Sequence, residues 1–197
     1  QVVSPLKALQ RLAERHREAF DIPVVGITGS NGKTVVKEWL YQLLSPEKNV
    51  TRSPRSYNSQ IGVPLSVWNL DERSEVGLFE AGISEPGEME ALQSGIQPPL
   101  GVFTCLGDAH QENFTSYEQK CLEKLKLFKD AKVLVYDMDD ARVVGCVNRS
   151  AFKGEYFAWS RQRRDVPLYI ASVEKREAET VVFYIYKGKE AACSIPF

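Results

Sequence analysis

Residues 24–44 read VVGITGSNGKTVVKEWLYQLL, and this stretch decides the fold. A short apolar run, 24–27, leads into a glycine-rich turn at 29–34. Apolar residues then recur at helical spacing, which predicts an amphipathic helix whose apolar face carries Val35, Val36, Trp39, Leu40, Leu43 and Leu44. A strand, a glycine turn that ends in Lys-Thr, and a helix are together typical of a phosphate-binding loop.

The turn supplies the groups that a phosphate needs. Its backbone N–H groups and the N-terminus of the helix would point at the anion. A lysine would add positive charge beside the β- and γ-phosphates, and a threonine hydroxyl would bind Mg²⁺. An ordinary glycine-rich turn is the alternative, and the strand and helix on either side favour phosphate binding. The residues expected around the phosphates are Gly29, Ser30, Asn31, Gly32, Lys33 and Thr34.

The amino-acid composition limits the class of protein and the kinds of partner that the chain can have. The hydrophobic content of 43% and charged content of 26% over 197 residues are those of an ordinary soluble globular protein. A net charge of −1 gives no electrostatic case for nucleic acid or an anionic membrane as a partner. No apolar run approaches the ~18 residues of a spanning helix, and no secretory signal is visible. Because the four cysteines lack metal-ligand spacing, we expect reduced thiols in a cytoplasmic protein.

Strands alternate with helices along most of the chain. The expected strands after the first are 49–52, 74–82, 99–104 and 131–136; the other expected helices are 5–20, 60–70, 86–93, 116–130 and 139–147. This alternation predicts a mostly parallel α/β sheet flanked by helices. From residue 154 the chain reads as strands joined by polar turns, at 156–159, 168–173, 180–186 and 191–195. We therefore expect an α/β core over 1–153 and a small flanking antiparallel β-subdomain over 154–197.

Polar residues follow two of the predicted strands. Glu80 closes the strand at 74–82, and His110 comes shortly after the strand at 99–104. Since ligands bind beyond the carboxyl ends of parallel strands, the topology would gather Thr34, Glu80 and His110 at one place. We predict that Glu80 binds magnesium together with Thr34. The alternatives are a solvated strand-end glutamate and a loop histidine that caps the next helix.

A lysine interrupts the apolar face of the helix predicted at 116–130. Tyr117, Cys121, Lys124 and Phe128 fall on one stripe of that helix. Ammonium groups are rarely buried without a partner. In one interpretation the Lys124 side chain runs along apolar surface to reach solvent. In the other, desolvation lowers its pKa and makes the neutral amine available for chemistry.

Four motifs stand in order along the chain: GITGSNGKT at 26–34, NSQIGVPL at 58–65, FEAGIS at 79–84 and HQENF at 110–114. Together they resemble the central ATPase domain of the Mur ligases, nearest to the MurF type and, within it, to the form fused to an alanine racemase. The resemblance covers nearly the whole chain and is strongest over 24–128. It also accounts for the position of Ile27, where nucleotide-binding loops usually have glycine, because this family uses TGxNGKT.

The resemblance implies ATP and two Mg²⁺ ions as cofactors. Gly29 to Thr34 would hold the ATP phosphates, and Thr34 and Glu80 would bind one magnesium ion. His110 would bind a second magnesium ion, and Asn58 would lie near the γ-phosphate. Lys124 falls where the family carries a carbamylated lysine, an anion that binds magnesium. On this basis the expected catalytic residues are Lys33, Asn58, His110 and Lys124.

The resemblance also implies an activity and partners. MurF-type ligases add D-alanyl-D-alanine to UDP-N-acetylmuramoyl-tripeptide through an acyl phosphate, in peptidoglycan synthesis. They need an N-terminal domain for the UDP-sugar peptide and a C-terminal domain that closes on ATP. Since the chain begins at Gln1 and stops directly after a strand-like stretch, we expect both domains to lie outside it and the isolated domain to be inactive. The alternatives are another Mur or folylpolyglutamate synthetase-like ligase, and a nucleotide-binding module without chemistry.

Overall fold

The stretch that decides the fold adopts the predicted strand, turn and helix. In the computed structural model, which describes residues 3–196, strand β1 spans Val24–Thr28 and helix α2 spans Lys33–Leu44. Gly32 lies between them with φ of 79°, in the left-handed region that glycine adopts without steric cost. The first turn of α2 therefore starts directly after the loop, with its free N–H groups at the loop.

A single mixed sheet organises the described residues, in the order β2-β3-β1-β4-β5-β6-β7-β8-β9. Every pairing from β2 to β7 is parallel, and β7, β8 and β9 pair antiparallel. This arrangement confirms the predicted fold class, a mostly parallel sheet with antiparallel strands toward the C-terminus. The bounds are β2 Val50–Arg52, β3 Val76–Glu80, β4 Leu100–Phe103, β5 Val133–Asp137, β6 Glu155–Ser160, β7 Leu168–Lys175, β8 Glu179–Tyr186 and β9 Lys189–Pro196.

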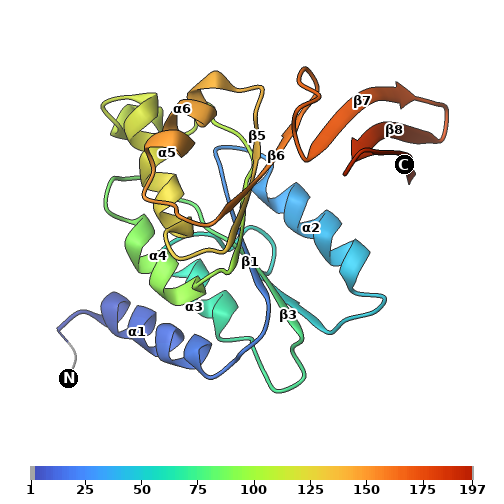
Figure 1. The fold of residues 1–197 in the computed structure, drawn as a ribbon. Helices are drawn as coiled ribbons and strands as arrows, with labels where there is room; N and C mark the ends of the chain where they lie inside the picture. The colour runs from blue at the N-terminus through green and yellow to red at the C-terminus, as the bar shows by residue number, and fades with distance from the viewer. Residues whose placement is uncertain (1–2, 197) are drawn as a thin grey trace.

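Strand β6 differs from its prediction. The sequence predicts that β6 belongs to the antiparallel subdomain, but β6 pairs parallel with β5 and so belongs to the main sheet. Helix α6 (Ala141–Arg149) connects β5 to β6, and a helical crossover of this kind returns the chain to run parallel. Only residues 168–196 form antiparallel strands, and β7 and β8 project from the main body of the molecule (Figure 1).

Helices cover the two faces of the sheet unequally. Figure 1 shows α2 on one side and the other helices on the opposite side. On that larger side Phe79, Phe103, Leu127 and Leu134 contribute to the buried core.

The predicted helix 116–130 is an α-helix that continues as one turn of 3₁₀ helix. The bounds are α1 Pro5–Glu18, α3 Gly62–Val67, α4 Met89–Ile96, α5 Tyr117–Leu125 and η2 Lys126–Phe128.

The predicted apolar face of α2 is wrong in part. Val35, Trp39 and Leu43 are 51%, 51% and 74% exposed. The buried residue of this helix is Lys37, whose exposed fraction is 0%. The reason lies in the tertiary arrangement: α2 contacts β1, β2 and β3 on one side, and the other described helices lie across the sheet. A helix that packs on one side buries a narrower stripe than its sequence pattern offers.

Candidate functional site

The phosphate-binding loop is held by the end of β4. A Cβ atom at Gly29 would lie 2.0 Å from Thr104 Oγ1, so only glycine allows this close approach. The Ser30 N–H donates to the Cys105 carbonyl at 2.8 Å, and the Thr104 hydroxyl donates to the Asn31 carbonyl at 2.6 Å. These contacts fix the loop backbone before any ligand binds.

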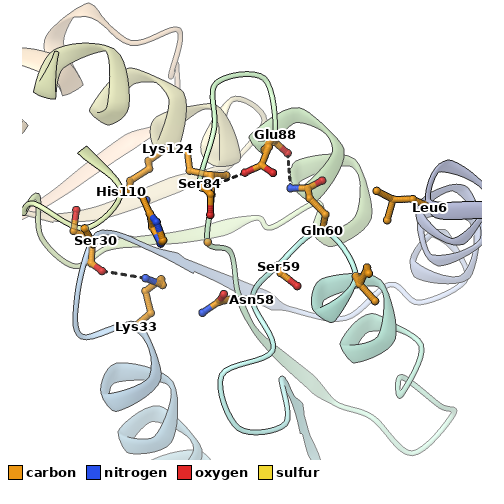
Figure 2. A pocket seen from close by; sticks show the side chains of 14 residues that line it. Leu6, Ser30, Lys33, Asn58, Ser59, Gln60, Ser84, Glu88, His110 and Lys124 are labelled. Atoms are coloured by element: carbon orange, nitrogen blue, oxygen red, sulfur yellow. Dashed lines mark hydrogen bonds between the residues drawn. The ribbon is translucent and has the colours of Figure 1, made fainter. Parts of the chain in front are cut away.

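Lys33 folds back over the loop. Its ammonium group donates to the carbonyl of Gly29 at 2.9 Å and to that of Ser30 at 3.3 Å, and Figure 2 shows the second of these bonds. Burial lowers the pKa of Lys33, and the nearby carboxylate of Glu80 opposes that shift. A partly desolvated ammonium beside backbone N–H groups is well suited to bind phosphate oxygens.

Thr34 and Glu80 meet as predicted. The Thr34 hydroxyl donates to Glu80 Oε2 at 3.0 Å, and Asn58 Nδ2 lies 3.5 Å from the same oxygen. The Glu80 side chain is fully buried. Its second oxygen, Oε1, lies 3.0 Å from Lys37 Nζ, close enough for an ion pair but outside hydrogen-bond geometry. A hydroxyl and a carboxylate are hard oxygen ligands, so this pair fits one Mg²⁺ ion that takes its remaining ligands from phosphates and water.

Asn58 is fixed through its backbone. Its carbonyl accepts from the N–H of Gly82 at 2.7 Å. A Cβ atom at Gly82 would lie 2.8 Å from Asn58 Oδ1, so a larger residue there would displace the amide. The loop that carries Asn58 and the tail of β3 therefore approach each other closely because position 82 is glycine.

Lys124 is buried on α5, with 3% of its surface exposed. This burial contradicts the interpretation in which the side chain reaches solvent. Its pKa is lowered to about 8, first by burial and then by the positive charges of Lys33 and Lys120. Among residues 3–196 its ammonium group has no hydrogen-bond or ion-pair partner. Burial and the neighbouring positive charges therefore make Lys124 easier to deprotonate than an ordinary lysine.

One cavity collects most of the predicted side chains. Its volume is about 460 Å³, and Lys33, Asn58 and His110 converge on it from three different elements, with Lys124 entering from α5 (Figure 2). His110 adopts a left-handed conformation with φ of 58°, directly before the 3₁₀ turn Gln111–Asn113. Thr34 and Glu80 adjoin the cavity through Asn58. The other lining residues are Leu6, Ser30, Ser59, Gln60, Ile61, Gly82, Ile83, Ser84, Glu88 and Ala109.

The two residues predicted to bind a second magnesium ion, His110 and Lys124, include no anionic side chain in the unmodified protein. Within residues 3–196 no group of three or more His, Cys, Asp or Glu side chains could hold a metal ion. His110 and Lys124 share the cavity wall, but an ammonium group repels a cation. These two residues fit a second Mg²⁺ only if Lys124 carries a negative charge.

Two buried lysines of the site were missed from the sequence. Lys120 is fully buried, and its ammonium donates to the carbonyls of Gly107 at 2.5 Å and Ala109 at 3.3 Å. The Ser30 hydroxyl donates to the same Gly107 carbonyl at 3.1 Å, which links the phosphate-binding loop to the segment before His110. Lys120 is one helical turn before Lys124, and this spacing was an available signal. Lys37 was missed because the apolar pattern placed it on the polar face.

A phosphate-binding loop at the carboxyl edge of a parallel sheet, with a carboxylate facing the loop threonine, defines a nucleotide-binding domain of the phosphate-loop type. Comparison with known families makes this class specific. The Mur ligase middle domain family matches residues 27–197, and the chain belongs to this family. The resemblance to the central domain of the Mur ligases, predicted from the four motifs, is thereby confirmed.

Individual relatives carry the name UDP-N-acetylmuramoyl-tripeptide–D-alanyl-D-alanine ligase. That of Bacillus subtilis is 33% identical over 138 residues, which cover 68% of this chain and 30% of the relative. That of Borreliella burgdorferi is 35% identical over 137 residues, with the same coverage of 68% and 30%. The chain therefore spans under a third of these relatives.

Solved structures agree with this family. The MurF ligase of Thermotoga maritima in complex with ADP matches with a TM-score of 0.86 and 27% identity, over 98% of this chain and 45% of that chain. MurF of Acinetobacter baumannii matches with a TM-score of 0.87 and 21% identity, over all of this chain and 43% of that one. These matches confirm the fold. No helix in the part of the chain that the structure describes is long and apolar enough to cross a membrane.

Proposed function

We propose that the chain is the ATP-binding domain of an ATP-dependent amide-bond ligase that adds D-alanyl-D-alanine to UDP-N-acetylmuramoyl-tripeptide in peptidoglycan synthesis. The observation that carries this proposal is the site itself: Lys33 and the buried Lys124 line one cavity beside the phosphate-binding loop, and the Thr34–Glu80 pair adjoins that cavity through Asn58. The names of the relatives support the choice of substrates. ATP is the nucleotide expected, in line with the ADP complex of the Thermotoga enzyme.

The proposed reaction has two steps. A carboxylate oxygen of the tripeptide attacks the γ-phosphorus of ATP, and the bond to the bridging oxygen breaks to give an acyl phosphate and ADP. The D-alanyl-D-alanine amine then attacks the acyl carbon, loses a proton and expels phosphate. The loop N–H groups and Lys33 would bind the phosphate oxygens and stabilise their growing charge. Thr34 and Glu80 would hold Mg²⁺, which neutralises phosphate charge when bound.

Lys124 is proposed to act as a carbamate. Its neutral amine would attack CO₂, form an N–C bond and release one proton, so that a cation becomes an anion. With a pKa of about 8, roughly one molecule in ten has this amine neutral at pH 7, far more than for an ordinary lysine. The modified Lys124 and His110 would then supply the ligands that a second Mg²⁺ needs.

The proposal includes partners outside the 197 residues. An N-terminal domain would hold the UDP-sugar peptide, and a C-terminal domain would close on ATP and bind the amine. We divide the chain itself into a core that extends through β6 and an antiparallel flank that begins with β7. A fused alanine racemase and a cytoplasmic location complete the proposal, and the four free thiols are compatible with a reducing compartment.

The test compares this domain with the complete polypeptide read from its gene. ADP release is measured with ATP, UDP-N-acetylmuramoyl-tripeptide and D-alanyl-D-alanine present. We expect turnover by the complete protein, and nucleotide binding without ligation by residues 1–197. Turnover with a different amine would favour another ligase of the superfamily. Nucleotide binding without turnover by the complete protein would favour a module without chemistry.

A further inference from the structure

Lys37 joins the three elements that form the proposed magnesium site. Its ammonium lies 3.0 Å from Glu80 Oε1 on β3 and 3.1 Å from Glu38 Oε1 on its own helix. It also donates to the carbonyl of Ser53 at 2.8 Å and to that of Arg55. The Lys37 and Glu80 side chains are both fully buried, so their contact is shielded from water.

Each of these contacts leads to a residue of the site. Helix α2 carries Thr34, one turn before Lys37. Strand β3 ends with Glu80, and the loop that begins at Ser53 continues to Asn58. The buried Lys37 thus holds the Glu80 carboxylate in place relative to the Thr34 hydroxyl and the Asn58 amide, which both contact Glu80 Oε2.

The two oxygens of Glu80 have different surroundings. Oε2 faces the site, where Thr34 donates to it at 3.0 Å. Oε1 faces Lys37 and is attracted by charge without a directed hydrogen bond. The Glu80 N–H donates to the Ser53 hydroxyl at 3.2 Å, so backbone and side chain are both held from the same direction. This arrangement leaves Oε2 as the oxygen available to a cation.

We propose that Lys37 is a positioning residue that aims Glu80 Oε2 at the magnesium ion of the bound nucleotide and keeps the Asn58 loop beside it. This inference rests on the proposed function, because it concerns the same nucleotide site. A lysine with a purely structural role would stabilise the fold without favouring the magnesium complex over the free nucleotide. Groups that orient metal ligands typically change metal affinity by about 10–100-fold when removed.

The experiment measures how strongly Mg²⁺ favours nucleotide binding. ADP is titrated calorimetrically into the purified protein, once with EDTA and once with saturating Mg²⁺. The coupling ratio is the Kd with EDTA divided by the Kd with Mg²⁺. For Lys37→Met we expect this ratio to fall about 10–100-fold, with the Kd in EDTA changed by less than about threefold. A ratio that is unchanged or raised, or an equal loss in both buffers, would overturn the proposal.

Two further variants make the result decisive. Glu38→Gln removes a partner of Lys37 that does not touch Glu80, and we expect its ratio to stay within about twofold of the wild type. If Lys37→Met does not fold, the coupling ratio of Lys37→Arg tests the proposal instead. A planar guanidinium cannot take the place of a compact ammonium, so this variant also misplaces Glu80. We expect its ratio to fall at least about fivefold, and an unchanged ratio contradicts the inference. A wild-type ratio of one would instead contradict the proposed magnesium site itself.

Discussion

Helix α2 buries Lys37 and helix α5 buries Lys124 at the same site, and these two lysines have opposite surroundings. Lys37, with 0% exposed, faces the carboxylate of Glu80 and backbone carbonyls. Lys124, with 3% exposed, is repelled by Lys33 and Lys120, and burial together with this repulsion lowers its pKa to about 8. Two lysines of similar burial therefore have opposite electrostatic surroundings: Lys37 faces a carboxylate, whereas Lys124 is repelled by other lysines.

The largest expected effect is on stability at Lys37. Replacing it with methionine leaves Glu80 buried without a counter-charge, and we expect the free energy of unfolding to fall by about 3–5 kcal/mol. Urea denaturation measures this change. Lys7→Met, at an exposed position of α1, is the control and should stay within about 0.5 kcal/mol of the wild type. A loss below about 1 kcal/mol for Lys37→Met would show that Lys37 and Glu80 are not a tightly coupled pair.

For Lys124 we expect the reverse of the result for Lys37: stability is kept and turnover is lost. Lys124→Met removes a buried charge that has no hydrogen-bond or ion-pair partner among the described residues, so we expect stability equal to or above that of the wild type. The ligase turnover of the complete protein should nevertheless fall by about 10²–10³-fold. The exposed Lys129→Met is the matched control, with turnover unchanged. Activity retained by Lys124→Met, together with a mass spectrum of unmodified lysine at high bicarbonate, would rule out the carbamate.

The pH dependence of the free energy of unfolding tests separately whether the pKa of Lys124 is lowered. In CO₂-free buffer the folded protein loses the Lys124 proton near pH 8, whereas the unfolded chain keeps it until about pH 10.5. Between these values the unfolded state binds more protons, so the free energy of unfolding rises with pH, by about 3 kcal/mol in total. The difference between wild type and Lys124→Met, measured by denaturation at several pH values, isolates this effect. A difference that is flat across the range would show that the Lys124 pKa is not lowered.

Lys120 should fall between the two extremes. Its partners are the carbonyls of Gly107 and Ala109, which carry no full charge. We expect Lys120→Met to reduce the free energy of unfolding by about 1–2 kcal/mol, because two carbonyls lose their donor. Hydrogen exchange should also be faster in the segment that leads to His110. A loss as large as that of Lys37→Met would mean that counter-charge does not distinguish the three lysines.

The sequence was sufficient where chemistry depends on neighbours along the chain. Residues 24–34 alone predict the strand, the glycine turn and the helix start, because glycine conformations and N–H groups are local properties. The meeting of Thr34 with Glu80 was also predictable, since parallel strands place their carboxyl ends at one edge. Lys124 was found because helical spacing alone puts it among apolar side chains.

Only the tertiary structure decided which face of α2 is buried. The apolar pattern favoured Val35, Trp39 and Leu43, yet these are exposed and Lys37 is buried, because α2 lies apart from the other described helices. Likewise β6 joins the parallel sheet because α6 carries the chain back to the same edge. The phosphate-binding loop can be predicted from its own residues. The burial of Lys37 cannot be predicted in this way, since it depends on partners that come from distant parts of the chain.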